Sequence, residues 1–177
     1  DLSIAFGGVV AASGISLDVH EGEHLAIIGP NGAGKTTFLN ICTGWLRPAS
    51  GTVRFEGREI TALAPRAISR MGIARAFQIP QLFSDNTVLE NMLLAAAAQA
   101  SRWSPFQRLA DIPERGEMLE LLRLVGCAEV AGEPARHLPE GQRKLIDIAL
   151  ALALRPRLLL IDEPTAGVAS AEKFAIM

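Results

Sequence analysis

Two short stretches of the sequence carry residue types that handle phosphate groups and metal ions. The first, Gly29–Thr36, reads GPNGAGKT and fits the pattern G-x-x-x-x-G-K-[ST], between an apolar run at Leu25–Ile28 and a predicted helix that ends near Cys42. Glycines let backbone N–H groups turn inward around phosphate oxygens, while a lysine reaches the β- and γ-phosphates and a threonine hydroxyl binds Mg²⁺. A glycine-rich turn that only joins a strand to a helix would not require that lysine and threonine.

The second stretch is the apolar run Leu158–Ile161, which ends in Asp162 and Glu163. A parallel strand buried on both faces reads as a continuous apolar run, and its carboxyl end opens toward the ligand crevice. Asp162 is therefore placed to hold Mg²⁺, and Glu163 to orient or deprotonate a water that attacks a γ-phosphate. Two acids at a solvated strand end would be the simpler interpretation, but together with the glycine-rich loop they predict a phosphate-loop nucleoside triphosphatase.

The composition excludes several other classes of protein. The chain has 177 residues, 49% hydrophobic and 20% charged, which is typical of one globular domain. A net charge of −2 gives no sign of a nucleic-acid-binding surface. Cys42 and Cys127 lie far apart with no CxxC spacing, which argues against a zinc site, and no apolar run approaches the roughly 18 residues that cross a membrane.

The first third of the chain predicts short strands and tight turns. Strands are expected at Ile15–Val19, which alternates apolar and polar residues, at Leu25–Ile28, and around Val53 and Phe55 between two turn signals. The chain begins without a methionine and ends inside a predicted helix that starts near Ser170, so we expect a truncated C-terminus and one incomplete domain over residues 1–177.

The middle of the chain predicts helices. Thr87 and Glu90 form a T-x-x-E capping box before a leucine- and alanine-rich run, and a second amphipathic helix follows, with a loop at Ser101–Glu114 between the two. A third helix is expected at Gln142–Leu154. The positions that define the second helix are Met118, Leu121, Leu122 and Val125. The sequence thus predicts an α/β core that is interrupted by a helical insert over about residues 86–136.

The segment Leu138-Pro139-Glu140-Gly141-Gln142 precedes the third helix and the strand that ends in Asp162. In this order it resembles the signature motif of the ATP-binding-cassette (ABC) ATPases, usually written LSGGQ. The resemblance implies that these residues cap the γ-phosphate of ATP held by a second, opposing ATPase. A glycine and a helix N-terminus suit that task, because the backbone can approach closely and the helix dipole favours an anion.

Other positions match the same family residue by residue. Gln78 stands where the family's Q-loop glutamine contacts Mg²⁺ and the attacking water, and Phe6 matches the aromatic that stacks on adenine, although it could equally be a core phenylalanine. Pro164–Val168 resembles the D-loop. The implied cofactors are ATP and Mg²⁺, with Thr36, Gln78 and Asp162 as metal ligands and Glu163 and Gln78 as catalytic residues. The implied nucleotide-binding residues are Phe6, Gly29, Pro30, Asn31, Gly32, Ala33, Gly34, Lys35, Thr36 and Thr37.

Within this superfamily, the strings Gly44–Pro48, Gly72–Gln78 and Leu82–Asn91 look like those of the ATPase subunits of bacterial branched-chain amino acid importers. That resemblance implies a RecA-like ABC ATPase core with an N-terminal antiparallel β subdomain. It also implies an ATPase that powers a transporter from the cytoplasmic face of the cell membrane. The expected partners are a second ABC ATPase, identical or not, and transmembrane permeases, with a periplasmic binding protein acting indirectly.

Three departures from the family pattern bear on catalysis. Pro139 replaces the usual signature serine, Ala169 stands where the D-loop has a polar residue, and the switch histidine expected after Glu163 is not reached. The histidines present are expected at the surface or in packing positions; they are His20, His24 and His137. We therefore expect ATP binding with weak hydrolysis.

Two alternatives belong to other functional classes. A soluble ABC ATPase of DNA repair or translation would usually carry long coiled coils or tandem ATPase domains, and no sustained heptads appear in this sequence. A phosphate-loop kinase or GTPase lacks support, because nothing resembles a guanine-specificity motif.

Overall fold

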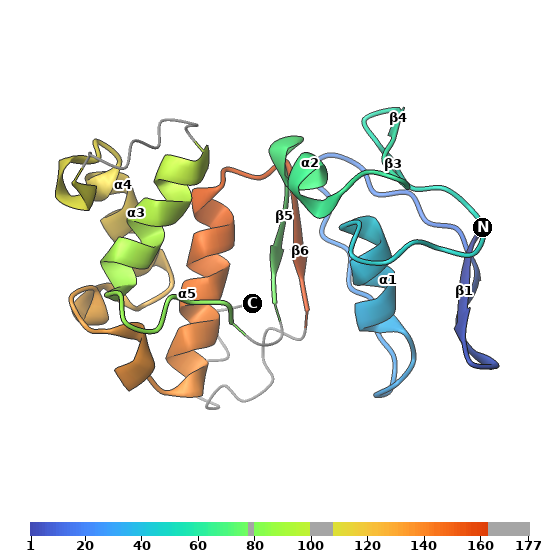
Figure 1. Cartoon of the computed structure of the whole chain (residues 1–177), viewed down its shortest axis with the longest axis horizontal. Coiled ribbons are helices and arrows are strands. Elements are labelled where there is room, and N and C mark those ends of the chain that lie inside the picture. The colour runs from blue at the N-terminus through green and yellow to red at the C-terminus, as the bar shows by residue number, and fades with distance from the viewer. Residues whose placement is uncertain (78–79, 100–107, 163–177) are drawn as a thin grey trace. The chain divides into compact units, whose positions relative to one another are not determined.

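The structure is a computed structural model that describes residues 1–77, 80–99 and 108–162. The chain divides into two compact units, Asp1–Met71 and Gly72–Met177. Figure 1 shows short strands and α1 in the first unit, and three longer helices beside a pair of strands in the second. The predicted helix near Ser170 lies outside the described residues.

The first unit contains two antiparallel ladders. Strand β1 (Leu2–Phe6) pairs with β2 (Val9–Ile15), and β3 (Arg54–Phe55) pairs with β4 (Arg58–Glu59). The turn between β3 and β4 has a positive φ at both central residues, 50° and 76°, as tight two-residue hairpins require. The predicted antiparallel β subdomain, including the strand near Phe55, is therefore confirmed.

Two strands expected in this unit are not formed. Strand β2 ends at Ile15 where a strand was predicted to begin, and residues 16–28 belong to no helix or strand. Leu25, Ile27 and Ile28 are 45%, 45% and 93% exposed, so the predicted buried strand at Leu25–Ile28 is wrong. An apolar run becomes a buried strand only when neighbours pair with its edges, and each ladder described in this unit is complete with two strands.

Helices α1 (Lys35–Cys42) and α2 (Pro65–Arg70) complete the first unit. Helix α1 has the predicted bounds. Helix α2 begins with a proline at its first turn, where a backbone N–H is not needed for a helical hydrogen bond. The apolar core gathers side chains of the β1–β2 hairpin and of α1, and its buried members are Leu2, Ile4, Ala12 and Ile41.

The second unit is organised on one pair of parallel strands. Strand β5 (Ile73–Ala76) pairs in register with β6 (Leu158–Ile161), and α5 (Glu140–Ala153) lies against β5. The predicted strand before Asp162 is confirmed, but its burial on both faces is not. Leu158–Leu160 are only partly buried and Ile161 is 37% exposed, because among the described residues β6 pairs with β5 alone.

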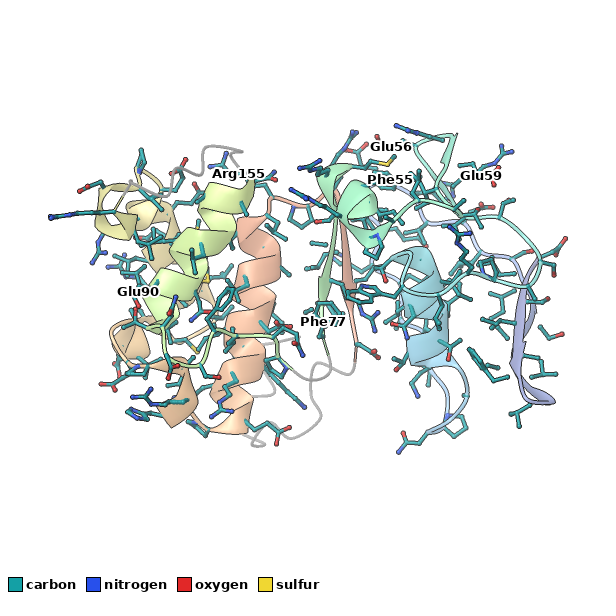
Figure 2. All side chains as sticks on the ribbon, in the orientation of Figure 1. Phe55, Glu56, Glu59, Phe77, Glu90 and Arg155 are labelled. Carbon is teal, nitrogen blue, oxygen red and sulfur yellow. The ribbon has the colours of Figure 1, made fainter. Side chains whose placement is uncertain are left out.

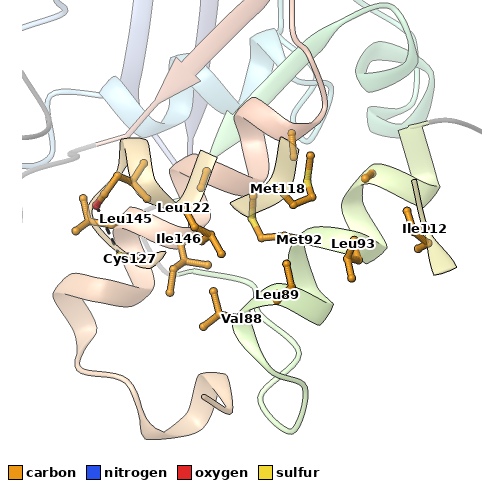
Figure 3. Packing of buried hydrophobic residues seen from close by; sticks show 14 of the residues in the cluster. Val88, Leu89, Met92, Leu93, Ile112, Met118, Leu122, Cys127, Leu145 and Ile146 are labelled. Carbon is orange, nitrogen blue, oxygen red and sulfur yellow. Dashed lines mark hydrogen bonds between the residues drawn. The ribbon is translucent and has the colours of Figure 1, made fainter. Parts of the chain in front are cut away.

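Three helices form the main hydrophobic core of this unit (Figure 3). Helix α3 (Val88–Gln99) and α4 (Arg115–Leu124) pack with α5, and Met118 and Leu122 of α4 are buried as the predicted periodicity requires. Three short 3₁₀ turns, Leu109–Asp111, Ala128–Val130 and Ala135–His137, connect these helices. No helix in the described part of the chain is long and apolar enough to cross a membrane.

The predicted capping box at the start of α3 is formed. The Thr87 N–H donates to Glu90 Oε2 at 2.8 Å, and the Glu90 N–H donates to Thr87 Oγ1 at 3.2 Å. This reciprocal arrangement satisfies two backbone donors that no helical carbonyl can reach. Helix α3 therefore begins where the sequence predicts.

Truncation of Leu122 should leave a cavity between α4 and its neighbours, because this side chain is completely buried. We expect Leu122→Ala to lower the free energy of unfolding by about 2–5 kcal/mol. The matched control is Leu124→Ala on the same helix, where the side chain is 69% exposed and the change should be within about 0.5 kcal/mol. Urea unfolding of both variants measures the difference, and equal losses would contradict the assigned core.

Candidate functional site

The glycine-rich loop ends in the first turn of α1. The Ala33 N–H donates to the Pro30 carbonyl at 3.1 Å, and the Phe38 N–H donates to the Gly34 carbonyl at 2.8 Å. Gly32 and Gly34 have φ of 81° and 87°, a left-handed conformation that costs glycine nothing and other residues a good deal. The loop is therefore a tight turn that leads directly into a helix.

Gly34 is the position where a side chain fits least well. It is the N-cap of α1, and a Cβ atom built on it would lie 2.0 Å from the carbonyl oxygen of Ala11 in β2. Gly32, two residues earlier, has no atom within 4 Å of such a Cβ. Gly34, the second glycine of the pattern, thus allows the tight turn and also lets the loop approach the β1–β2 hairpin closely.

Lys35 folds back over the loop that precedes it. Its Nζ donates to the carbonyl oxygens of Gly29 at 2.8 Å and Pro30 at 3.0 Å. The ammonium group therefore lies on the same loop whose backbone is expected to surround phosphates. Thr36 and Thr37 follow on the first turn of α1 and are partly exposed. The structure brings all the predicted phosphate-binding residues, Gly29–Thr37, together in one local site.

Asp162 lies buried at the carboxyl end of β6, in an ion pair. Arg75 Nη2 donates to Asp162 Oδ2 at 2.9 Å, and the two side chains are only 5% and 2% exposed. Arg75 is paired in register with Leu160, so it shares a sheet face with the residue two positions beyond. The Arg75 guanidinium also lies 5.2 Å from the centre of the Phe77 ring, which Figure 2 places beside the strand pair.

A second buried carboxylate, Asp147 on α5, holds the chain just beyond β5. The Phe77 N–H donates to Asp147 Oδ2 at 2.6 Å, and the backbone of Gln81 donates to the same carboxyl group. Burial raises the pKa of Asp147 from 3.8 to about 6, although the two hydrogen bonds act in the opposite direction.

The predicted signature segment spans the start of α5. Leu138 is buried in the three-helix core, Pro139 is the N-cap, and α5 begins at Glu140, two residues earlier than predicted. Gly141 is thus the second residue of the helix rather than its opening. An acid in the first turn is favoured by the helix dipole, which explains the earlier start. Glu140 also lies 3.4 Å from Lys144 Nζ.

The remaining predicted site residues divide into two groups. Phe6 is 48% exposed at the end of β1, so the alternative of a core phenylalanine is wrong. Gln78, Glu163, the D-loop residues Pro164–Val168 and Ala169 lie outside the described residues. The three histidines are all exposed, as predicted.

Sequence reasoning missed Arg75 and Asp147. Arg75 is a charged residue within the otherwise apolar β5, and Asp147 is a charged residue in the mostly apolar run Leu145–Ala153 of α5. Charged residues are rarely buried without a partner, so this pattern was the available signal. What it could not reveal is the partner, 87 residues from Arg75 and 70 residues from Asp147 along the chain.

The donor atoms in these segments suit magnesium rather than a softer metal. Thr36 offers a hydroxyl and Asp162 a carboxylate, and Mg²⁺ prefers such oxygen ligands together with substrate phosphates. Among the described residues, no group of three or more His, Cys, Asp or Glu side chains could hold a metal by itself. Each of these two groups suits a Mg²⁺ ion that also binds phosphate oxygens.

The two loop glycines provide a matched pair of substitutions. Gly32→Ala should cost about 1 kcal/mol of folding free energy, because only the positive φ is strained. Gly34→Ala should cost roughly 1–3 kcal/mol more, because its Cβ also meets the Ala11 carbonyl. Thermal and urea unfolding of the two variants test this order. Equal destabilisation would show that the close approach to β2 is unimportant.

The raised pKa of Asp147 predicts how stability depends on pH. An acid whose pKa is higher in the folded state binds a proton more readily there, so it favours folding at low pH and opposes it once ionised. Between pH 4 and pH 7 the free energy of unfolding should fall by about 2–2.5 kcal/mol relative to Asp147→Asn, given a shift of about two units. Urea unfolding of both proteins across this range measures the difference. The exposed Asp111→Asn variant is the control, and parallel profiles for wild type and Asp147→Asn would contradict the assignment.

Comparison with known proteins places this geometry in context. The family model described as "ABC transporter" matches residues 12–166. The high-affinity branched-chain amino acid transport ATP-binding protein LivG of Salmonella typhimurium is 36% identical over 174 residues, covering 94% of this chain and 68% of that protein. The probable branched-chain amino acid transport ATP-binding protein LivG of Archaeoglobus fulgidus is 39% identical over 172 residues, covering 95% of this chain and 67% of that protein.

Solved structures agree. A nucleotide-free ATP-binding cassette from an ABC transporter superposes with a TM-score of 0.81 at 34% identity, covering 99% of this chain and 71% of that one. A dimeric ATP-binding cassette in a post-hydrolysis state with ADP and Pi gives a TM-score of 0.79 at 26% identity, with 99% and 76% covered. On the match over residues 12–166 and these likenesses, the chain belongs to the ABC transporter family, among its ATP-binding and ATP-hydrolysing subunits.

Proposed function

We propose that this chain is the ATPase of an importer for branched-chain amino acids or related small solutes. The observation that carries the ATPase part is the turn Gly29–Gly34 leading into α1, with Lys35 folded over it. The transport part is supported by relatives at 36–39% identity that are named for branched-chain amino acid transport. Their names favour a role in transport over one in DNA repair or translation.

In this proposal the loop Gly29–Thr37 surrounds the phosphates of ATP. Its backbone N–H groups and the α1 N-terminus meet the phosphate oxygens, and the Lys35 ammonium neutralises charge at the β- and γ-phosphates. Phe6 stacks on the adenine, a role that its 48% exposure at the end of β1 permits.

Metal binding and water activation are assigned to the residues that the sequence predicts for them. Thr36, Gln78 and Asp162 are the proposed Mg²⁺ ligands, and Mg²⁺ would offset the charge on the β- and γ-phosphate oxygens. Arg75 keeps the buried Asp162 carboxylate fixed through their 2.9 Å contact. Glu163 accepts a proton from the attacking water, and Gln78 helps to orient that water.

The segment Leu138–Gln142 is proposed to cap the γ-phosphate of ATP on a second ABC ATPase, identical or different. The dimeric relative with ADP and Pi supports a paired arrangement. In this chain Pro139 offers no hydroxyl to that phosphate. Loss of such a charge-assisted hydrogen bond would weaken capping by about 1.5–3 kcal/mol.

Permease subunits and a place at the cytoplasmic face of the membrane complete the proposal, with a periplasmic binding protein acting indirectly. Residues 1–177 would belong to one nucleotide-binding domain, and 86–136 would be its helical subdomain. Helices α3 and α4 supply the described part of that subdomain and would face the permease.

Replacement of Lys35 tests the nucleotide site. Lys35→Ala should weaken ATP binding at least tenfold, because the ammonium group that neutralises the terminal phosphates is lost. Arg70→Ala, which removes an equal charge from an exposed position on α2, is the control and should bind as wild type does. Fluorescence titration with a labelled ATP analogue measures both. Unchanged affinity for Lys35→Ala would rule out the proposed phosphate site.

The transport assignment is tested by recovery of partners. The protein at its native length is tagged and purified from washed, detergent-solubilised membranes, and co-purified proteins are identified by mass spectrometry. Two permeases and a second ATPase are the expected result. If only ribosomal or DNA-repair proteins are recovered, without any membrane protein, the import assignment is refuted and the ATPase assignment remains.

A further inference from the structure

The carboxyl group of Asp147 connects α5 to the segment that follows β5. It accepts the Phe77 N–H at 2.6 Å and the backbone N–H of Gln81, and the residue is only 6% exposed. Phe77 is the first residue beyond β5, and Gln81 lies four positions further along. One buried side chain therefore fixes both flanks of the short span that contains Gln78.

The two backbone partners of this carboxyl group are both N–H donors, which suits an acceptor-only group. An ionised carboxylate has two oxygens that both accept, whereas an asparagine of the same shape offers one acceptor and one donor. The chain uses an amide where the partners differ. Asn91 on α3 accepts the Phe83 N–H at 2.8 Å and donates to the carbonyls of Phe83 and Thr87 at 3.1 and 2.9 Å. At position 147 the partners are the backbone N–H groups of Phe77 and Gln81, and a carboxylate suits both.

The other end of this connection is the start of α5. Glu140, the first residue of the helix, lies seven residues before Asp147, which is two turns and about 10 Å along one helix. The intervening face is buried in the three-helix core through Leu145 and Ile146. Because α5 is one continuous helix from Glu140 to Ala153, a displacement of its first turn would reach Asp147 and, through its hydrogen bonds, Phe77 and Gln81.

Retention of a buried carboxylate is unfavourable for the fold, as the raised pKa of Asp147 indicates. A fold that needed only to anchor one loop could do so with neutral side chains, as it does at Asn91. The ionisable group is consistent with a demand for two simultaneous hydrogen bonds on either side of Gln78.

We propose that Asp147 is a positioning residue that couples the signature helix α5 to the backbone at Phe77 and Gln81, the two residues that flank the segment in which the sequence has Gln78. This inference rests on the proposed ATPase function. Asp147 acts through the backbone that it holds. Binding of a second subunit's nucleotide to residues 138–142 would thus change the position of the backbone at Phe77 and Gln81.

The first test is amide hydrogen exchange on the full-length protein. In Asp147→Asn, one of the two amides, Phe77 or Gln81, should lose at least tenfold in protection, while the ladder amides of β5 exchange as in wild type. Asp111→Asn, an equal charge change at an exposed position, should leave both amides protected. Unchanged protection at both amides in Asp147→Asn would overturn the proposed connection.

The second test is steady-state ATP hydrolysis by the same proteins. Asp147→Asn should lower kcat about tenfold or more with KM for ATP within twofold, because geometry is disturbed without loss of a nucleotide contact. Asp147→Glu keeps two acceptor oxygens and should recover most of kcat; it also carries the test if Asp147→Asn does not fold. Two results would overturn the coupling but leave the proposed ATPase function standing. One is a wild-type kcat in Asp147→Asn although the amide has lost its protection. The other is a reduced kcat in Asp147→Glu although both amides stay protected. A wild-type protein that neither binds nor hydrolyses ATP would refute the proposed function itself.

Discussion

The cost of removing a carboxylate from water is the constraint on which the second unit depends. Two acids are buried in the described part of this unit, and each is compensated differently. Asp162 is paired with Arg75, which ties the carboxyl end of β6 to β5, and Asp147 is solvated by two backbone N–H groups. Removal of the Arg75 side chain, for example, would leave the buried Asp162 carboxylate without its compensating charge. Such a change is among the more destabilising ones known for protein interiors. The position of the backbone that follows β5 therefore depends on these electrostatic contacts as well as on apolar packing in the three-helix core.

Features that depend on local chemistry could be predicted from the sequence. The glycines and lysine before α1, the Thr87–Glu90 capping box and the spacing of apolar residues in α4 all act within a few residues, and all are present. Features that depend on distant partners could not. Leu25–Ile28 has the composition of a buried strand, yet composition does not state whether a pairing strand is available. Likewise, the roles of Arg75 and Asp147 depend on hydrogen-bond partners that lie 87 and 70 residues away in the sequence.

The beginning of α5 differs in charge from the glycine-rich start that the family motif implies. Glu140 places a carboxylate in the first turn, where the helix dipole would otherwise favour an approaching phosphate. Lys144, one turn later and 3.4 Å away, offsets part of that charge. If this end of α5 meets a partner's nucleotide as proposed, Glu140 must turn aside, since a like charge would oppose the phosphate. The pairing with Lys144 provides such an orientation.

The contacts of Lys35 have a consequence for the affinity of the loop for a nucleotide. Its ammonium group already has two good acceptors in the Gly29 and Pro30 carbonyls, at 2.8 and 3.0 Å. A phosphate gains this lysine only in exchange for hydrogen bonds of comparable geometry, so the net gain in affinity is smaller than the charge alone suggests. The same acceptors remain within reach when a product departs. The affinity of this loop for a nucleotide therefore depends on the exchange of one set of hydrogen bonds for another, and not on the charge of Lys35 alone.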